Sequence, residues 1–227
     1  NDAFKKALNL TPSQLRRESN NSATHQSIEL SYRGSYDWRY TLDFYNLRSV
    51  TGLEKIDGNS YQRYVNIDDD QAWFKITFGI KPNKVLLEFE LDDVTQLKKL
   101  VMQVRRVFDL DVDTQLIEQY FEELQPGMVI RSGIRMPGVW NVWEAGVRAI
   151  LGQQVSIKAA INQLNLLVST LQGGHVTHFP TPQELVDADL SFLRMPQSRK
   201  DTLRRFADLM ASNPEADFTQ WLELKGI

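Results

Sequence analysis

The stretch RMPGVWNVWEAGVRAILGQQVS, residues 135–156, decides the fold of the carboxyl-terminal half of the sequence. Asn141, with Glu144 three positions later, is the capping-box pattern that opens a helix. The apolar residues of that helix recur on one face: Val142, Trp143, Val147, Ile150 and Leu151. Gly152–Gln154 interrupts the pattern, and a second helix begins near Ser156. The stretch therefore predicts two helices joined by a short polar turn.

Helical patterns extend well beyond this stretch. From residue 113 onward the strand signals disappear and helical periodicity takes over. Thr181 and Glu184 form a second capping box with Pro182 between them, and Asp189 is a candidate cap. The other predicted helices span residues 113–125, 156–171, 198–211 and 216–224. The carboxyl-terminal half is thus predicted to be all-helical.

Residues 27–110 combine strands with two helices. Ile28, Leu30 and Tyr32 alternate with polar neighbours, as in a half-buried strand. Turn residues separate the further strands predicted at residues 50–56, 61–67, 72–78 and 84–91. Helices are predicted at residues 36–47, with Asp37 near the start, and at 93–108. Because such short connections require antiparallel pairing, we predict an α+β domain with one antiparallel sheet covered by two helices.

The sequence is therefore divided into four parts. Residues 1–18 read as helical turns around a break, and residues 19–26 form a Ser/Asn/Thr-rich linker without apolar periodicity. The α+β domain (27–110) and the helical domain (111–227) follow. The chain begins with Asn1 rather than Met and stops at Lys225-Gly226-Ile227. We expect it to be a piece of a longer polypeptide, truncated at both ends.

Composition excludes several classes of function. The 227 residues contain no cysteine and three histidines, which rules out disulfides, cysteine-ligated metals and a cysteine nucleophile. We expect no cofactor, no metal site and a reducing, cytoplasmic setting. No apolar run reaches the roughly 18 residues of a membrane span, so no membrane association is expected.

The net charge of −3 conceals local basic segments. Residues 133–171 carry three basic side chains against one acidic, and residues 194–206 carry five against one. These segments are where an electrostatic footprint for nucleic acid would lie, although charge clusters on helices are usually solvated faces. Asp68–Asp70 reads as a solvated turn, and His175 and His178 read as surface histidines. The residues alone therefore indicate no reaction.

A family resemblance supplies what composition does not. Arg148–Ser156 resembles the start of the glycosylase domain in the 3-methyladenine DNA glycosylase II (AlkA-like) family of the helix-hairpin-helix superfamily. Tyr36–Trp38, Phe44 and Arg48–Val50 resemble its amino-terminal domain, which is similar to half of a TATA-binding-protein saddle. Three further segments fall in the expected order: Val107–Leu110, Phe179–Pro182 and Met195-Pro196. The resemblance runs from about Ile28 to the end of the chain.

The resemblance implies a repair enzyme acting on double-stranded DNA with alkylated bases. Such enzymes flip the damaged nucleotide out of the duplex and hydrolyse its N-glycosidic bond, and we expect a monomer. The helix–helix turn supplies the side chain that fills the gap, and Gln154 falls at the wedge position; the alternative is a plain polar turn. The DNA-contacting residues implied are Gln153, Gln154, Ser156, Lys158, Arg199 and Lys200.

Phe44 matches the family's pocket aromatic from the amino-terminal domain. An electron-rich ring can favour cationic alkylated bases through cation–π contact. The alternative interpretation is an ordinary core phenylalanine on an amphipathic helix. Trp143 is interpreted as a core residue, while the role of Trp140 is left open.

The last residues resemble the opening of the family's hairpin. Glu223–Ile227, including Gly226 and Ile227, matches the segment whose backbone N–H groups bind a DNA phosphate in the family. The catalytic aspartate is expected about twenty residues further on, beyond Ile227. No catalytic residue is therefore assigned within the sequence, and the chain as given is predicted to be inactive.

The first residues resemble the closing helices of an AraC-type helix-turn-helix regulator. The match covers Ala3–Lys5 and Leu10–Arg17. Ada-like proteins fuse such a regulator to a glycosylase, which is the arrangement expected here. Two alternatives stay open: a damage-responsive DNA-binding transcriptional regulator whose glycosylase domain lacks catalysis, and an all-helical interaction module unconnected to nucleic acid.

Overall fold

The computed structural model describes residues 26–68 and 70–213. The predictions for residues 1–18, the helix at 216–224, Gly226 and Ile227 lie outside the described residues. The chain divides into two compact units, the first ending at Gly138 and the second starting at Val139. Each unit is described by itself.

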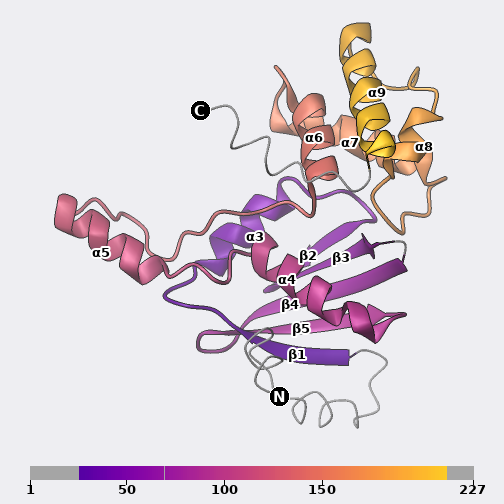
Figure 1. The fold of residues 1–227 in the computed structure, drawn as a ribbon. Coiled ribbons are helices and arrows are strands. Elements are labelled where there is room, and N and C mark those ends of the chain that lie inside the picture. Colours follow the sequence, from indigo (N-terminus) through magenta and orange to yellow (C-terminus); the bar gives the residue numbers. More distant parts are fainter. Residues whose placement is uncertain (1–25, 69, 214–227) are drawn as a thin grey trace. The chain divides into compact units, whose positions relative to one another are not determined.

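The first unit is built on one five-stranded antiparallel sheet (Figure 1). Its strands lie in the order β1-β5-β4-β3-β2, with bounds β1 (Gln26–Ser31), β2 (Glu54–Asp57), β3 (Ser60–Ile67), β4 (Asp70–Lys81) and β5 (Lys84–Leu91). Ile28 of β1 pairs with Leu87 of β5, which pairs in turn with Ile76 of β4. All three are buried, so the alternation along each strand sets the register. The predicted antiparallel sheet is confirmed.

Strand β2 starts later than predicted. The sequence favoured a strand from Val50, but the structure has a turn at 50–53 in which the N–H groups of Leu53 and Glu54 donate to the carbonyl of Val50, at 3.1 and 2.9 Å. Gly52 adopts a φ of 84°, which suits glycine. Val50 and Leu53 are buried although they belong to no strand. Their apolar character therefore reflects a buried turn rather than sheet pairing.

Helices α3 (Trp38–Asn46) and α4 (Leu97–Val107), the latter preceded by the 3₁₀ turn η1 (Val94–Gln96), pack against one face of the sheet. Asp37 caps α3 as predicted by accepting the Tyr40 N–H at 3.1 Å. Tyr45 of α3 lies 5.2 Å from the ring of Tyr61 in β3 and 5.4 Å from Phe108 at the end of α4. Because these rings come from both helices and the sheet, the two helices share one aromatic core.

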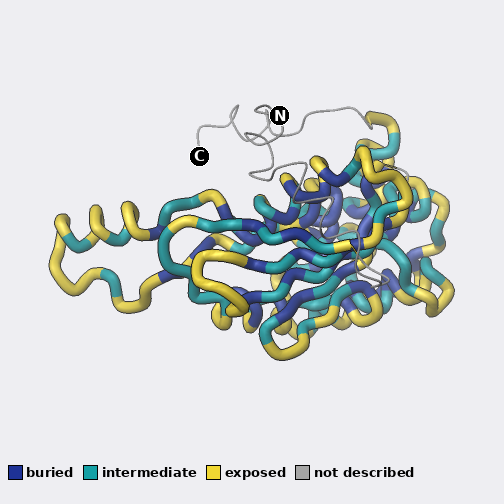
Figure 2. Tube along the Cα trace, turned by 90° about the horizontal axis from the view of Figure 1, so that it is seen from below, coloured by how far each residue is buried: buried dark blue, intermediate teal, exposed yellow. Residues whose placement is uncertain are grey.

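Helix α5 (Thr114–Leu124) extends away from the sheet in Figure 1. A return segment, residues 125–138, leads back from it, and Figure 2 shows that α5 is mostly exposed or half-buried. The Gly138 N–H donates to the Val107 carbonyl at 2.9 Å, and the Tyr45 hydroxyl donates to the carbonyls of Val107 and Gly138 at 2.7 and 3.1 Å. Sequence reasoning placed residues 111–138 in the helical domain. These hydrogen bonds instead tie the end of that segment, at Gly138, to the sheet domain.

The second unit contains α6 (Val142–Gly152), α7 (Ile157–Leu171), α8 (Pro182–Val186) and α9 (Gln197–Ser212). Asn141 and Ser156 cap α6 and α7, and Thr181 with Glu184 forms the predicted capping box of α8. Two predicted starts differ. Asp189 accepts the Ser191 N–H at 2.9 Å and closes a turn instead of a helix. Helix α9 begins at Gln197, one residue before the predicted start. Pro196 precedes it in an extended conformation and supplies no side-chain cap.

Candidate nucleic-acid interface

The turn between α6 and α7 presents the two glutamines singled out by the sequence. Gln153 ends α6 in an extended conformation, and Gln154 has a φ of 56°, in the left-handed region. Both side chains are exposed. A non-glycine residue in that region carries roughly 1 kcal/mol or more of strain, and such residues cluster at functional sites. The turn is therefore a defined structure that holds Gln154 in an uncommon conformation.

The start of α7 completes this polar surface. The Ser156 hydroxyl accepts the Ala159 N–H at 3.2 Å, and both Ser156 and Lys158 are exposed. Val155 and Ile157 flank Ser156 and are 43% and 49% exposed. Sequence reasoning did not single out these two apolar side chains. The one signal that could have identified them is their position at the turn, outside the apolar stripe of a helix.

The scaffold beneath the turn is tightly packed. The Trp143 indole donates to the Pro180 carbonyl at 2.7 Å, and its ring stacks on Phe206 of α9 at 5.2 Å. The absence of a side chain at Gly146 makes room for this stacking, because a Cβ there would lie 2.3 Å from the Phe206 ring. Trp143 is a core residue as predicted, and Trp140, whose role was left open, is also buried.

Buried charge on α6 is paired within the helix. The Arg148 guanidinium donates to the Glu144 carboxylate at 2.7 Å, one turn apart, and Glu144 is almost fully buried. A buried carboxylate requires such a partner, because desolvation disfavours the isolated charge. Arg148, the first residue of the family-like stretch, is thus held inside the helical unit rather than free to contact DNA.

The basic start of α9 is partly engaged with a neighbouring turn. Arg199 and Lys200 are half-buried. The Lys200 ammonium donates to the Ser191 carbonyl at 3.2 Å, and Arg204 donates to the Ala188 carbonyl at the same distance. Hydrogen bonds from the Ser191 hydroxyl and N–H hold the pKa of the nearby Asp189 below its usual value. The basic side chains of α9 therefore bond to an ordered turn that also contains the Asp189 carboxylate.

Phe44 belongs to the first unit and already carries a cation on its ring. The guanidinium of Arg48, one helical turn later, lies 3.8 Å from the Phe44 ring centroid and donates to the Phe44 carbonyl at 3.2 Å. Tyr45 contacts the same ring edge-to-face at 5.7 Å. Phe44 is half-buried rather than part of the closed core. Sequence reasoning gave Arg48 no role, although a spacing of four places it over the Phe44 ring.

The remaining candidate chemistry has structural explanations. Asp68 pairs with Lys99, and the Asp70 carboxylate accepts from the Gln96 amide at 2.6 Å. His175 is exposed, while His178 lies 3.3 Å from Glu184 beside the capping box of α8. Within residues 26–68 and 70–213, no group of three His, Cys, Asp or Glu side chains is arranged to hold a metal ion. None of the helices described there is long and apolar enough to cross a bilayer.

A solved structure of another protein shares the fold of this chain. The chain is an α+β protein with the fold of the 3-methyladenine DNA glycosylase from Archaeoglobus fulgidus, at a TM-score of 0.61 and 15% identity, over 88% of this chain and 70% of that one. Residues 27–141 match the family model for the AlkA N-terminal domain, which is just over half of the chain. The chain therefore belongs to the AlkA family.

Two curated relatives extend the comparison. DNA-3-methyladenine glycosylase 2 of Escherichia coli is 29% identical over 188 residues, which covers 79% of this chain and 65% of the relative. The "Probable bifunctional transcriptional activator/DNA repair enzyme AlkA" of Mycobacterium tuberculosis is 27% identical over 228 residues, which covers 93% of this chain and 46% of the relative. The chain thus spans about two thirds of one relative and under half of the other.

Proposed function

We propose that this chain is the DNA-engaging part of a repair glycosylase that flips alkylated bases out of duplex DNA and hydrolyses their N-glycosidic bonds. Membership of the AlkA family and the names of the curated relatives support the reaction class. The observation that carries the proposal is the exposed α6–α7 turn, with Gln154 held in the left-handed region. The substrate is then double-stranded DNA, bound by a monomer in the bacterial cytoplasm.

Gln154 is proposed to occupy the gap left by the flipped nucleotide. Extrusion requires a few kcal/mol of unstacking and unpairing, and an inserted side chain offsets part of that loss. A glutamine amide both donates and accepts hydrogen bonds, so it can pair with the orphaned base. Val155 and Ile157 add exposed apolar surface beside it. Gln153, Ser156 and Lys158 would then contact the flanking backbone.

Arg199 and Lys200 are proposed to contact DNA phosphates. They belong to residues 194–206, where five basic side chains against one acidic give a local basic excess within a chain of net charge −3. Contacts of this kind release counterions, so affinity should fall steeply as salt concentration rises. An interaction module unrelated to nucleic acid would bind no DNA at any salt concentration.

Phe44 is proposed to stack on the flipped base. Bases alkylated on a ring nitrogen are often cationic, and the face of an aromatic ring attracts cations. The position of Arg48 over Phe44, at 3.8 Å, supports this because the ring already holds a guanidinium. The incoming base would replace Arg48 on that face.

The excision step is proposed to need residues outside this chain. No residue between 26 and 213 is assigned as the catalytic aspartate, and Gly226 and Ile227 are proposed to start the phosphate-binding hairpin. The 227-residue chain should therefore bind damaged DNA without releasing bases. Release of 3-methyladenine from alkylated DNA by this chain would contradict that proposal.

An equilibrium binding titration tests the wedge. Fluorescence anisotropy would compare a duplex containing an abasic-site analogue with the same duplex undamaged. Gln154→Ala is expected to reduce the preference for the abasic duplex about tenfold, equal to about 1.4 kcal/mol. Gln119→Ala, on an exposed position of α5, is the matched control and should change nothing. An unchanged preference in Gln154→Ala, with circular dichroism showing a folded chain, rejects the wedge.

A second function is favoured by the Mycobacterium relative. That protein is named as both a transcriptional activator and a repair enzyme, and it matches 93% of this chain. We propose as the alternative a damage-responsive regulator whose glycosylase domain binds DNA without excising bases, with residues 1–18 as the end of an AraC-type domain. Base release by the intact protein decides for the enzyme, and damage-dependent DNA binding without base release decides for the regulator.

A further inference from the structure

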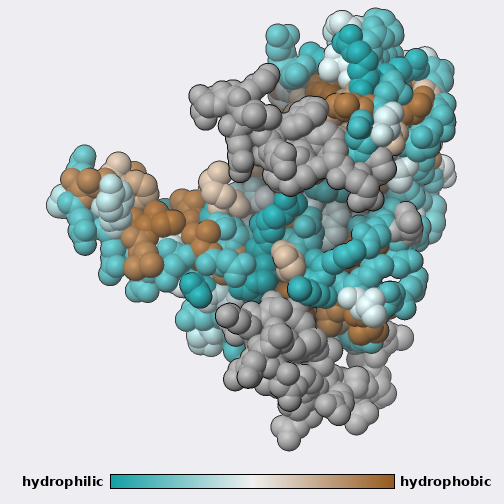
Figure 3. All heavy atoms as spheres, viewed as in Figure 1, coloured by the Kyte–Doolittle hydropathy of each residue, from teal (hydrophilic) through white to brown (hydrophobic). Residues whose placement is uncertain are grey.

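Three aromatic rings of α3 each have an arginine lying against them. The guanidinium lies 3.8–5.2 Å from the ring centroid in every pair: Trp38 with Arg39, Tyr40 with Arg131, and Phe44 with Arg48. Trp38 is also stacked on Phe78 of β4, at 6.4 Å. Tyr40 and Phe44 are one helical turn apart and therefore lie on the same side of α3. Figure 3 shows that the surface around α3 is mainly hydrophilic, unlike the surface over α5.

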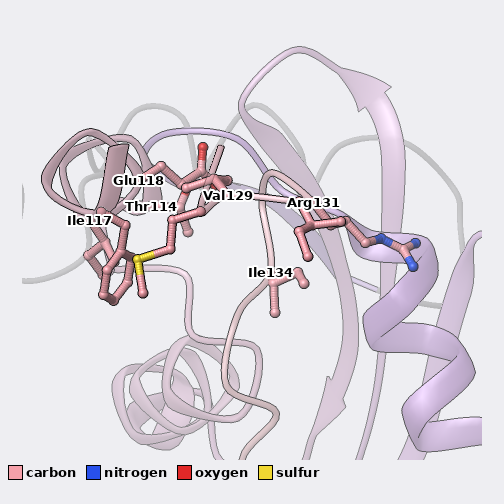
Figure 4. Close-up of a pocket in the computed structure, with 9 residues that line it drawn as sticks. Thr114, Ile117, Glu118, Val129, Arg131 and Ile134 are labelled. Carbon is pink, nitrogen blue, oxygen red and sulfur yellow. The ribbon is translucent and has the colours of Figure 1, made fainter. Parts of the chain in front are cut away.

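Tyr40 and Arg131 form a fixed unit, which we call the Tyr40–Arg131 pair. Arg131 belongs to the return segment, and in Figure 4 its guanidinium extends away from the apolar groove beside α5 and toward α3. Its Nε donates to the carboxylate of Asp37, the cap of α3. In the part of the chain that the structure describes, neither the terminal nitrogens of Arg131 nor the Tyr40 hydroxyl make a hydrogen bond. The guanidinium is thus oriented by one carboxylate and one ring, while its terminal donors are unused.

The Tyr40–Arg131 pair is accessible to a ligand. Tyr40 is 38% exposed, and the Arg131 side chain is 50% exposed. A nucleic-acid base can stack on an aromatic ring or on a guanidinium plane, and the guanidinium fork matches phosphate oxygens. An ion pair this exposed contributes little to stability, so holding the return segment in place does not account for the arrangement. The pair offers what a nucleotide requires, a flat surface for the base and donors for the phosphate.

The spacing of the two rings selects the form of the nucleic acid. Tyr40 and Phe44 are separated by about 6 Å along the helix axis, four residues at 1.5 Å each. Neighbouring nucleotides in one strand of a duplex are only about 3.4 Å apart. Two consecutive nucleotides can therefore reach both rings only if their bases are unstacked. The ligand that fits is an unpaired, extended strand.

The charge around α3 favours the same ligand. The helix, its cap and its ring contacts carry three arginines against two aspartates, a net charge of +1: Arg39, Arg48, Arg131, Asp37 and Asp43. The hydrogen bond to Asp37, with a smaller contribution from Asp43, raises the pKa of Arg131, so its guanidinium stays charged. An acidic peptide would satisfy that charge but would leave the two rings without a partner.

We propose that the Tyr40–Arg131 pair binds an unpaired nucleotide, adjacent in the strand to the one that stacks on Phe44. Tyr40 supplies a surface for the base, and the terminal nitrogens of Arg131 donate to the phosphate. This inference rests on the proposed role of Phe44 and extends it from one base to two consecutive nucleotides. Helix α3 then holds the strand in the unstacked form that base flipping produces.

Binding of a short single strand by the 227-residue chain tests the pair. Fluorescence anisotropy would compare a labelled oligothymidylate with an oligomer of equal length made of abasic nucleotides, which keeps the phosphates and lacks the bases. Tyr40→Ala is expected to weaken oligothymidylate binding about tenfold and to leave binding of the abasic oligomer unchanged. Tyr40→Phe keeps the ring and should bind like the unmodified chain. Tyr64→Ala, at a tyrosine of β3 that is 40% exposed, is the matched control and should change neither affinity.

Salt dependence tests the phosphate contact. Arg131→Met is expected to weaken binding of both oligomers and to reduce the slope of log K against log salt concentration by about 0.7, the contribution of one phosphate in a single strand. Lys99→Met is the matched control, because Lys99 is also an exposed cation paired with one carboxylate, that of Asp68. It should leave the slope unchanged.

Several outcomes overturn the inference. They are no binding of oligothymidylate by the unmodified chain, an unchanged affinity in Tyr40→Ala with a native circular dichroism spectrum, and equal losses in Tyr40→Ala and Tyr64→Ala. Binding of polyglutamate as tight as that of oligothymidylate, and equally dependent on Arg131, would assign the pair to acidic proteins and also overturn it.

Phe44→Leu separates this inference from the proposed base pocket. A loss of oligothymidylate affinity in Phe44→Leu without one in Tyr40→Ala rejects the Tyr40–Arg131 pair and keeps the pocket. A loss in Tyr40→Ala alone supports the pair and rejects the role of Phe44. Losses in both variants support the two-nucleotide site.

Discussion

Replacing Arg135 should destabilise the sheet domain more than replacing any exposed arginine. Its guanidinium is buried, with 3% of the residue exposed, and it donates to four carbonyls: those of Arg33, Ser35, Asp109 and Val112. It also lies 4.5 Å from the ring centroid of Tyr36. Burial lowers the pKa of Arg135, while the neighbouring Tyr36 and Asp109 act in the opposite direction. The side chain thus joins the loop after β1, the end of α4 and the return segment.

Arg135→Met keeps the length and removes every donor. Each hydrogen bond to a charged group contributes about 1.5 kcal/mol or more, and release of the buried charge offsets part of the loss. The expected decrease in the free energy of unfolding is therefore about 3–5 kcal/mol. Arg135→Lys, which keeps the charge but loses the planar fork, should show about half of that decrease.

Urea unfolding of the 227-residue chain, followed by far-ultraviolet circular dichroism, provides the measurement. With an m-value of about 2 kcal/mol/M, Arg135→Met should lower the midpoint by roughly 2 M. Arg131→Met is the control, because Arg131 is half-exposed and pairs with Asp37 at the surface; it should lose less than about 1 kcal/mol. If Arg135→Met lies within 1 kcal/mol of the unmodified chain, the four-carbonyl interaction does not hold these loops together.

Two further perturbations test the helical unit. Gly146→Ala should decrease stability by about 2–3 kcal/mol in thermal unfolding, because the added Cβ would lie 2.3 Å from an aromatic ring. Gly152→Ala is the control: its Cβ meets only an ordinary 3.9 Å contact, so the substitution should be neutral or slightly stabilising. Equal losses of stability in the two variants would contradict the packing around Gly146. Burial raises the pKa of Glu184, but hydrogen bonds from the Thr181 N–H and hydroxyl outweigh it and hold the pKa below its ordinary value near 4.5. The stabilisation by the Glu184 carboxylate is therefore complete above about pH 4.5 and is lost as pH falls through the folded pKa. In Glu184→Gln, the free energy of unfolding should decline less steeply below pH 4.5 than in the unmodified chain.

Most secondary structure followed from local signals. The span 84–91 was predicted in full because its alternation and its flanking turns agree. The caps at Asp37, Asn141, Ser156 and Thr181 were likewise recoverable, since a capping side chain bonds to its own first turn. The turn at 50–53 was not, because a buried turn and a short strand have the same apolar composition.

The candidate site was less accessible to sequence reasoning. Arg135 gave no sign of burial, because its partners are backbone carbonyls that carry no side-chain signal. The left-handed conformation of Gln154 was also invisible, since glycine or asparagine usually marks such a position.

The way α5 is attached has a calorimetric consequence. Glu118 and Glu122 accept hydrogen bonds from the backbone N–H groups of Gly133 and Gly127, while three apolar side chains of α5 are already 60–65% exposed: Leu116, Tyr120 and Leu124. Detaching α5 from the return segment therefore hydrates little new apolar surface, and apolar hydration is the main source of the heat-capacity increase on unfolding. Release of α5 would then add little to the heat-capacity increase of the first unit, which would report mainly the exposure of its aromatic core.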